Sequence, residues 1–410
     1  MKNVVIVGAG LAGLTCARRL QVEGVTCQII EASDGVGGRV RTDVVDGFRL
    51  DRGFQVLLTA YPEVQRWLDL KALDLQEFWP GAKVWNGSDW ATVADPRRRW
   101  TDLFRSLSAD IGSAGDKLKV VQWALQAAQG DETSHWTQPE TTALAALQRR
   151  GFSTQMINAF WRPWLSGIFL EDELSTSSRM LEFVFGMFAR GGTAVPAKGM
   201  GEIPRQLAGG LPEGGITLNE RATAVEPGRV WTESRGAWRA DHIVLALEPG
   251  AAAKLGVEDM PARWNGARCL YFAVEGRQER SPLLMLNGTS KGIVNHAAWM
   301  DAIAPDYAPA NRSLLMAGIK ASVQGDETDI EHAARAELAQ WFGEREVAGW
   351  KLLRHSWVPQ ALPMRQQLNR IETGPIAPGI WRCGDACSTA SIQGAMESGR
   401  RTAEHILRWV

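Results

Sequence analysis

The apolar residues near the start of the chain fall into two short runs with a helical stretch between them. Residues 4–7, Val-Val-Ile-Val, are β-branched and predict a strand. Glycines at positions 8, 10 and 13 follow, and the residues after them have the apolar spacing of a helix. A second strand is predicted to end at Glu31. Together these elements predict a strand–helix–strand unit that runs to about Ala32.

The next part of the chain changes its pattern twice. Residues 43–58 predict a short hairpin, with Asp46-Gly47 at the turn. From about residue 62 to about residue 188 the pattern becomes helical, and Asp95-Pro96 is a candidate for a helix start within it. We therefore expect a helical insertion at about residues 95–190.

Strand patterns return in the second half of the chain. Residues 215–249 are rich in strand and turn signals, and residues 267–320 alternate as in a second, mostly antiparallel sheet. The last thirty or so residues predict a strand, a loop and a final helix. Pieces of a dinucleotide-binding fold therefore occur at the start, the middle and the end, with other material inserted between them.

Composition and charge exclude several classes of protein. Apolar residues make up 45% and charged residues 22% of the 410 residues, which is typical of a globular protein, and the net charge is only −1. No basic block indicates a nucleic-acid partner. Glycines interrupt the first apolar run, so a signal peptide is a poor interpretation, and no apolar stretch approaches the ~20 residues of a membrane span. Five scattered cysteines fit a reducing, cytoplasmic location.

The glycines between the first strand and helix match a dinucleotide-binding turn. Gly8 permits a tight turn, Gly10 lets the backbone approach a pyrophosphate, and Gly13 allows close packing of helix and strand. The helix N-terminus then offers N–H groups to the phosphates. Glu31, at the end of the second strand, can accept hydrogen bonds from ribose hydroxyls, which argues against NADP.

The loop after Glu31 favours FAD over NAD as the cofactor. Gly37-Gly38-Arg39 adds a second glycine pair and a cation, which suit a longer cofactor than NAD. The stretch resembles the N-terminal signature of the flavin-dependent amine oxidase superfamily, which includes monoamine and polyamine oxidases, protoporphyrinogen oxidases and phytoene desaturases. The resemblance implies that Glu31 holds the adenosine ribose and that Arg39 lies near the pyrophosphate. The residues expected to contact FAD in this segment are Gly8, Gly10, Leu11, Ala12, Gly13, Glu31, Ala32, Gly37, Gly38 and Arg39.

Four later segments extend the resemblance in the family's order. The stretch at residues 47–57 resembles a segment that reaches the flavin ring, and residues 196–200, Pro-Ala-Lys-Gly-Met, resemble a stretch of protoporphyrinogen oxidases and desaturases. The C-terminal stretch resembles the flavin-closing motif, and residues 222–230 match a fourth segment, whose backbone holds the adenine. They imply further FAD contacts from Gly53, Phe54, Gln55, Val225 (through its backbone, to the adenine), Gly384, Asp385, Ser391, Ile392 and Gln393. The last helix is expected to start at Ile392 or Gln393 with Ser388 or Ser391 as its N-cap, and Gly394 is expected to let the flavin approach.

The resemblance implies an α/β fold built from two domains. A GR2-type, Rossmann-like FAD-binding domain is expected from residues 1–60, 195–255 and 370–410. A mixed α+β substrate domain is expected from residues 61–194 and 256–369, and it contains the helical insertion. The family's covalent-flavin motif is missing, so the FAD is expected to be noncovalent.

Catalytic side chains are not identified by pattern. Trp357, just before the last flavin segment, and Lys320 are weak candidates, and no His, Cys or acidic cluster has metal-ligand spacing. Of the 18 tryptophans, four fall in the helical insertion: Trp123, Trp136, Trp161 and Trp164. They are interpreted either as core residues or as walls of a substrate tunnel. The apolar stretch 157–170 is a buried helix or, at most, a peripheral membrane contact.

The expected function is therefore an FAD-dependent oxidoreductase. It would take a hydride from a C–N or C–C bond of an apolar small molecule, with oxygen or a quinone as electron acceptor. Protoporphyrinogen-oxidase-like or desaturase-like chemistry fits slightly better than amine oxidation, because of the stretch at residues 196–200 and the scarcity of tyrosine. A flavin-dependent amine oxidase, a flavin-dependent isomerase and a non-catalytic binding protein like the Rab escort proteins remain the alternatives.

Overall fold

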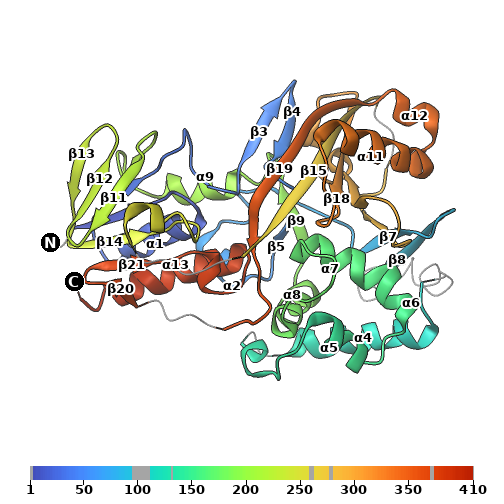
Figure 1. Ribbon diagram of the computed structural model, residues 1–410, viewed down its shortest axis with the longest axis horizontal. Coiled ribbons are helices and arrows are strands. Elements are labelled where there is room, and N and C mark those ends of the chain that lie inside the picture. The colour runs from blue at the N-terminus through green and yellow to red at the C-terminus, as the bar shows by residue number, and fades with distance from the viewer. Residues whose placement is uncertain are drawn as a thin grey trace.

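The first two apolar runs pair as parallel strands in a six-stranded sheet. The computed structural model describes residues 3–94, 111–130, 133–257, 263–276, 280–369 and 374–409 (Figure 1). The strand order is β10-β2-β1-β14-β21-β20, and all pairs except the last are parallel. The strands are β1 (Val4–Val7), β2 (Cys27–Ile30), β10 (Ile216–Thr217), β14 (His242–Leu245), β20 (Pro375–Ala377) and β21 (Ile380–Arg382).

Two helices from opposite ends of the sequence pack together against this sheet. Helix α1 (Leu11–Val22) lies beside α13 (Ile392–Ile406), as the blue and red helices of Figure 1 show. A Cβ atom at Gly399 would lie 2.1 Å from the carbonyl oxygen of Ala12, so only glycine permits this approach of the helices. Helix α9 (Glu202–Gly209) also contacts α1. The start, middle and end of the chain thus meet around one sheet.

Two small three-stranded sheets and one hairpin accompany the six-stranded sheet. Strands β11 (Ala222–Glu226), β12 (Arg229–Thr232) and β13 (Gly236–Arg239) form the first three-stranded sheet, and its buried residues share a small core with β14. The predicted hairpin forms from β3 (Thr42–Val45) and β4 (Phe48–Asp51), with positive φ at both Asp46 and Gly47. A second three-stranded sheet joins β5 (Leu57–Leu58), β9 (Thr193–Pro196) and β6 (Leu75–Glu77).

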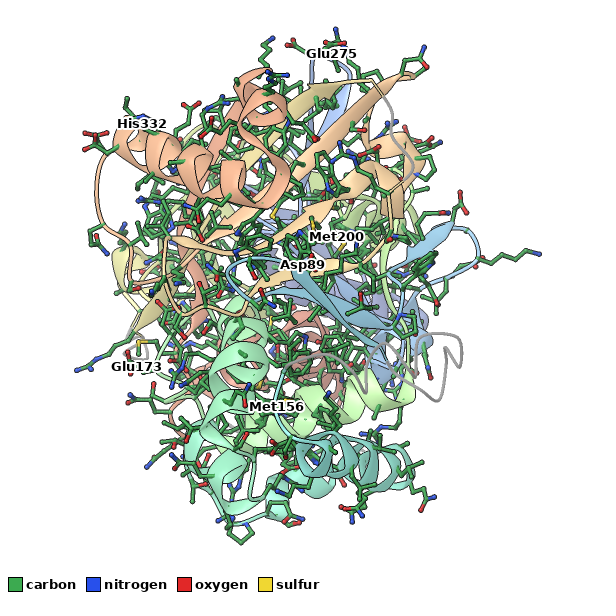
Figure 2. All side chains as sticks on the ribbon, turned by 90° about the vertical axis from the view of Figure 1, so that its right-hand side faces the viewer. Asp89, Met156, Glu173, Met200, Glu275 and His332 are labelled. Carbon is green, nitrogen blue, oxygen red and sulfur yellow. The ribbon has the colours of Figure 1, made fainter. Side chains whose placement is uncertain are left out.

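A seven-stranded, mainly antiparallel sheet forms the second layer of the fold, in the order β19-β15-β18-β17-β16-β7-β8. Helix α11 (Glu327–Phe342) packs on one face (Figures 1 and 2). In Figure 2, His332 on this helix lies in the upper part of the view and Met156 lies in the lower half. The strands are β7 (Gly81–Trp85), β8 (Trp90–Ala94), β15 (Trp264–Glu275), β16 (Leu284–Asn287), β17 (Val294–Trp299), β18 (Arg312–Ile319) and β19 (Lys351–Pro363).

Strands β6, β7 and β8 correct the expectation of a helical pattern from about residue 62 to about residue 188. Strand β7 pairs in parallel with β16, two hundred residues later, and antiparallel with β8. Runs of three to five residues are too short to reveal a period, but Asn86-Gly87 between β7 and β8 was an available turn signal. The pairing with β16 is what makes this segment a strand.

The helices of the expected insertion, the helical unit, come after β8 in the chain. The unit contains α4 (Ala114–Gln129), α5 (Ala143–Arg149), α6 (Thr154–Met156), a π-helical turn (Ile157–Trp161), α7 (Arg162–Phe169) and α8 (Ser178–Arg190). Ser113, Thr142, Ser153 and Ser177 cap four of these helices. The expected helix start at Asp95-Pro96 lies outside the described residues. The remaining helices are α2 (Pro62–Trp67), α10 (Met300–Ile303) and α12 (Glu344–Ala348), and 3-10 turns lie at Ser134–Thr137, Ala253–Leu255, Pro305–Tyr307 and Asp385–Cys387.

The apolar stretch 157–170 is mostly packed inside the molecule. Trp161, Leu165 and Phe169 are almost completely buried in the main core. In the part of the chain that the structure describes, no helix has both the length and the apolar character that crossing a bilayer requires.

Candidate functional site

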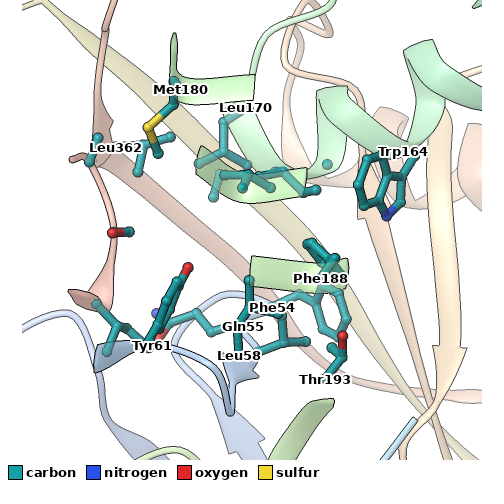
Figure 3. Close-up of a pocket in the computed structure, with 18 of the residues that line it drawn as sticks. Phe54, Gln55, Leu58, Tyr61, Trp164, Leu170, Met180, Phe188, Thr193 and Leu362 are labelled. Atoms are coloured by element: carbon teal, nitrogen blue, oxygen red, sulfur yellow. The ribbon is translucent and has the colours of Figure 1, made fainter. Parts of the chain in front are cut away.

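One large cavity runs from the glycine turns of the six-stranded sheet to the helical unit. Its volume is about 1120 Å³. One end carries glycines and charged groups. The other end is apolar, and Figure 3 shows part of its wall. The cavity brings together these residues that the sequence singled out: Gly8, Gly10, Leu11, Ala12, Glu31, Gly37, Gly38, Arg39, Gly53, Phe54, Gln55, Gly384, Asp385, Ser391 and Ile392. Gly13, Ala32, Val225 and Gln393 are not among its lining residues.

Glycine occupies the three positions of the first turn for different structural reasons. Gly8 has a φ of +106°, and a Cβ there would lie 2.5 Å from the carbonyl oxygen of Ala246. A Cβ at Gly13 would lie 2.1 Å from the carbonyl oxygen of Gly8, so this glycine serves helix–strand packing. A Cβ at Gly10 would meet nothing within 4 Å. Gly10 therefore presents open backbone to the cavity at the start of α1.

Glu31 accepts three hydrogen bonds immediately after β2. Its Oε2 accepts from the backbone N–H of Ala9 at 2.7 Å, and its Oε1 accepts from the N–H and the hydroxyl of Ser33 at 2.9 and 2.7 Å. The carboxylate thus ties the glycine turn to the loop that follows β2. Its position in the cavity wall leaves it available to a ligand on the open side.

Arg39 joins three segments that are far apart in the sequence. Its Nη2 donates to Asp385 Oδ1 and its Nη1 donates to the carbonyl oxygen of Ala361, both at 2.7 Å, while Glu248 lies 3.7 Å from its Nε. Burial alone would lower the pKa of the guanidinium, but Asp385 and Glu248 raise that pKa above its usual value. Arg39 is therefore a permanently charged group at the polar end of the cavity.

The N-terminus of α13 lies at the cavity wall. The helix begins at Ile392, and the hydroxyl of its N-cap Ser391 accepts from the N–H of Gly394 at 3.1 Å. The side chain of Gln393 turns to α2 instead, where its Oε1 accepts from the N–H of Glu63 at 2.9 Å. A Cβ at Gly394 would lie 1.7 Å from the carbonyl oxygen of Thr389, and the expectation that this glycine lets the flavin approach stays a prediction. This glycine makes room for the preceding backbone.

Val225 and Ala32 are two of the predicted residues that do not line the cavity. Val225 is buried in β11, where its side chain packs in the small core beside β14. Ala32 follows Glu31 in the chain. The contact of Val225 to FAD was expected through its backbone, and the contacts of both residues stay predictions.

Aromatic and aliphatic side chains line the other end of the cavity. Figure 3 shows Phe54 and Tyr61 on one side, with Leu170 and Met180 across from them. Burial raises the pKa of the Tyr61 hydroxyl far above its usual range, and the Tyr61 ring stacks on Phe183. The wall continues through Leu58, Trp164, Phe185, Phe188, Leu284 and Leu286.

The tryptophans of the helical unit divide between the cavity and the core. Trp161 and Trp164 belong to the cavity wall. Trp123 is 3% exposed and stacks on Phe185 at a centroid distance of 3.8 Å, while Trp136 packs against the edge of the core. Core packing is therefore confirmed for Trp123, Trp136 and Trp161, and a substrate tunnel walled by Trp161 and Trp164 stays a prediction.

Neither weak catalytic candidate lies in the cavity wall. Trp357 is 47% exposed on β19, and its ring lies 4.7 Å from the Arg268 guanidinium. Alternation along the strand turns this side chain outward. Lys320, at the end of β18, donates from Nζ to the carbonyl oxygens of Lys291 and Gly292 at 2.9 and 2.8 Å.

His296 in β17 is a cavity residue that the sequence did not indicate. It is 7% exposed, lines the cavity, and lies 5.2 Å from the Phe54 ring between centroids. Burial lowers the pKa of its imidazole to about 4. The sequence around it, Val-Asn-His-Ala-Ala-Trp, carries no recognisable motif, so only the fold reveals its place.

Comparisons with known proteins place this geometry in a family. The family of flavin containing amine oxidoreductases matches residues 11–407. A coproporphyrinogen III oxidase from Mycobacterium tuberculosis is 26% identical over 292 residues, which cover 65% of this chain and 63% of that protein. A putrescine oxidase from Kocuria rosea is 25% identical over 296 residues, which cover 63% of this chain and 59% of that protein. These matches span less than two thirds of either relative.

Solved structures share the fold over nearly the whole chain. Putrescine oxidase bound to putrescine has a TM-score of 0.71 at 16% identity, with 99% of both chains covered. An oxidoreductase from Methanosarcina mazei has a TM-score of 0.73 at 16% identity, covering 98% of this chain and all of that one. Reduced UDP-galactopyranose mutase has a TM-score of 0.72 at 15% identity, covering 100% and 94%. The family match over residues 11–407, on a cavity that joins a glycine-rich dinucleotide turn to an apolar chamber, shows that this chain belongs to the flavin-containing amine oxidoreductase family.

Proposed function

We propose that the protein is an oxidoreductase with noncovalently bound FAD that takes a hydride from a C–N or C–C bond of an apolar small molecule, as protoporphyrinogen oxidases and desaturases do. The observation that carries this proposal is the continuity of the cavity. Its glycine-rich end suits the dinucleotide, and its apolar end suits an apolar substrate. Oxygen or a quinone would accept the electrons.

The polar end fits a dinucleotide longer than NAD. Gly10 and Gly37 form an isolated parallel bridge, so the two glycine turns lie side by side at the N-terminus of α1. The open backbone at Gly10, the α1 N-terminus and the Arg39 guanidinium offer N–H donors and positive charge to a pyrophosphate. Glu31 is placed to accept a ribose hydroxyl. A bound flavin would supply the two-electron acceptor that the side chains themselves lack.

The cavity is large enough for a cofactor and a substrate together. Its volume of about 1120 Å³ exceeds the range of roughly 300–1,000 Å³ for sites that hold one ligand. No cysteine occurs among the described residues of its wall, which supports noncovalent binding. Cys383 and Cys387 are buried in the core beside the last strand.

The distribution of carboxylates favours a neutral or anionic substrate over an amine. Four acidic residues line the cavity among the described residues: Glu31, Glu77, Glu248 and Asp385. Glu31 lies at the glycine turns, Asp385 and Glu248 lie beside Arg39, and Glu77 is solvent-exposed. Within the described part of the chain, the apolar end therefore has no buried carboxylate to hold an ammonium group. This supports porphyrinogen-like or polyene-like substrates, and an amine oxidase is the second candidate because of the putrescine oxidase relatives.

The wall residues would bind and shield the substrate. Phe54, Tyr61, Trp164 and Phe188 offer flat apolar surfaces and exclude water from the reacting bond. Tyr61 and His296 are held uncharged by burial, so neither carries a charge into this end of the cavity. An isomerase reaction or a purely binding role, as in the Rab escort proteins, would use the same walls without net oxidation.

Release and identification of the cofactor test the first half of the proposal. The purified protein is expected to yield FAD in acid, identified by mass spectrometry, and recovery of NAD alone would refute it. Gly10→Val is expected to weaken FAD binding at least tenfold, because its φ of −72° suits any residue while the new methyl groups would enter the open face. Gly209→Val is the matched control, since a Cβ there also meets nothing within 4 Å and the site lies outside the cavity wall.

Anaerobic bleaching of the flavin tests the second half. Porphyrinogens, polyenes and amines are mixed in turn with the flavin-loaded protein, and the loss of its visible absorbance is followed. Bleaching by a porphyrinogen or a polyene is the expected result. Bleaching by amines alone would establish the amine oxidase alternative, and the absence of bleaching by all three classes would favour the isomerase or binding roles.

A further inference from the structure

A small polar niche adjoins the apolar end of the main cavity. Its volume is about 20 Å³, enough for one water molecule or one ligand oxygen atom. The niche and the cavity share five wall residues: Phe54, Gly167, Leu170, Ala267 and His296. A group that extends from the cavity past Phe54 would therefore enter the niche.

Two glycines create the slot that holds the imidazole of His296. A Cβ at Gly318, directly opposite on β18, would lie 2.4 Å from Nε2, and a Cβ at Gly167 would lie 3.2 Å from Nδ1. The ring therefore lies across β18, between the sheet and α7. Any side chain at Gly318 would expel it from this place.

Asn295 determines which nitrogen of His296 carries the proton. The amide nitrogen of Asn295 donates to the carbonyl oxygen of Pro163 at 2.9 Å and lies 3.0 Å from His296 Nδ1. Because an amide nitrogen can only donate, Nδ1 must accept, and the proton of the neutral ring is on Nε2. Asn295 is 4% exposed, so this arrangement is buried and fixed.

The donors of the niche have no acceptor within the described part of the chain. Nε2 of His296 and Oγ of Ser166 are both buried and lack a hydrogen-bond partner there, and both residues line the niche. Ser166 is 6% exposed. Buried donors without acceptors are costly and uncommon, so their presence here points to an acceptor supplied by a ligand.

The charges around the niche favour an anionic acceptor. Arg268 and Lys320 line it with two positive charges, against one negative charge from Asp172. The Nζ of Lys320 already donates to the carbonyl oxygens of Lys291 and Gly292, so Arg268 supplies the main positive charge. Asp172 Oδ2 already accepts from the N–H and the hydroxyl of Ser322. An oxygen with negative charge is therefore better matched to this place than a water molecule or an ammonium group.

We propose that the niche binds one oxygen of a substrate carboxylate, with Nε2–H of His296 and the Ser166 hydroxyl as its donors. The carbon skeleton of the substrate then lies in the apolar end of the cavity. The inference rests on the proposed function and narrows its substrate class to apolar molecules that carry a carboxylate. Asn295 acts as a positioning residue, because it holds the tautomer of His296 without reaching the ligand.

Two probes with the same ring and opposite charge test the proposal. Benzoate and benzylamine are titrated into the flavin-loaded protein and followed by calorimetry and by the flavin absorbance. Wild-type protein is expected to bind benzoate more tightly. His296→Phe, which keeps a ring and removes the donor, is expected to weaken benzoate about tenfold, or ~1.4 kcal/mol, and to leave benzylamine unchanged. His296→Gln restores an N–H donor and is expected to recover most of the benzoate affinity.

His332→Phe is the matched control, because this histidine is exposed on α11 and lines neither the cavity nor the niche. Unchanged benzoate affinity in His296→Phe, or tighter binding of benzylamine by the wild type, would overturn the proposal. If His296→Phe does not fold, loss of benzoate binding in folded Ser166→Ala supports the proposal, and its retention overturns it. Calorimetry requires no turnover, so a protein that binds benzoate through His296 but bleaches with no substrate would separate this inference from the proposed function.

Discussion

Replacing Glu31 by glutamine removes one charge from the glycine turn while keeping the shape of the side chain. The carboxylate accepts three hydrogen bonds, one from Ala9 and two from Ser33. Glutamine offers a single carbonyl oxygen. If that oxygen faces the two donors of Ser33, the new NH₂ group faces the N–H of Ala9 at 2.7 Å, donor against donor.

The expected losses of stability and of FAD affinity follow from the hydrogen bond that glutamine cannot make. One charge-assisted hydrogen bond disappears, and removing such a bond typically costs about 1.5–3 kcal/mol. Part of this is expected as a lower free energy of unfolding of the flavin-free protein, because the turn is tied to Glu31 before any ligand binds. FAD affinity is expected to fall by ~1–3 kcal/mol, or roughly 5- to 150-fold, since the ribose would lose a charged acceptor.

Urea denaturation of the flavin-free protein and titration of that protein with FAD measure the two effects separately. Glu23→Gln is the matched control: Glu23 pairs with Arg19 at 2.7 Å on the surface of α1, and exposed pairs contribute about 0–1 kcal/mol. Unchanged stability together with unchanged FAD affinity in Glu31→Gln would show that the three hydrogen bonds do not organise the turn. Lower stability with normal affinity would show that Glu31 is structural and does not contact the ribose.

Three further predictions concern stability, measured by urea denaturation. Ser391→Ala is expected to lower the free energy of unfolding by about 1 kcal/mol, because the N-cap of α13 is lost. Ser391→Asp should retain the cap and the stability, and an equal loss in both variants would contradict a capping role. Arg400→Ala is expected to lower the free energy of unfolding by about 3–5 kcal/mol, because Arg400 pairs with Glu63, which is only 2% exposed. The other cation beside Glu63 is Arg66, which is half-exposed. A loss below about 1 kcal/mol would mean that Arg66 or water replaces Arg400. Burial raises the pKa of Asp51 to about 6, so the folded state binds a proton more tightly than the unfolded one, and stability should fall as pH rises from about 4 to about 6. Asp51→Asn should flatten that slope, and an identical pH profile in wild type and variant would refute it.

Features decided within a few residues were predictable. The Asp46-Gly47 turn, the start of α13 at Ile392 and the cap by Ser391 all follow from local backbone sterics and local hydrogen bonds. The family resemblance along the chain is confirmed by the match over residues 11–407. The individual FAD contacts remain predictions, although fifteen of the nineteen residues expected to make them lie in one cavity wall.

The tertiary structure decided whatever depends on distant partners. Strand β7 exists because it pairs with β16, and no local period distinguishes it from a helix turn. Arg39 becomes a link between segments only when folding brings Asp385, 346 positions later, to its guanidinium. His296 is an ordinary strand residue in the sequence, and it reaches the cavity because Gly318 and Gly167 leave a slot and Asn295 orients the ring. Short-range geometry is encoded in neighbouring residues, whereas the chemistry of a cavity wall depends on which remote side chains long-range pairing places together.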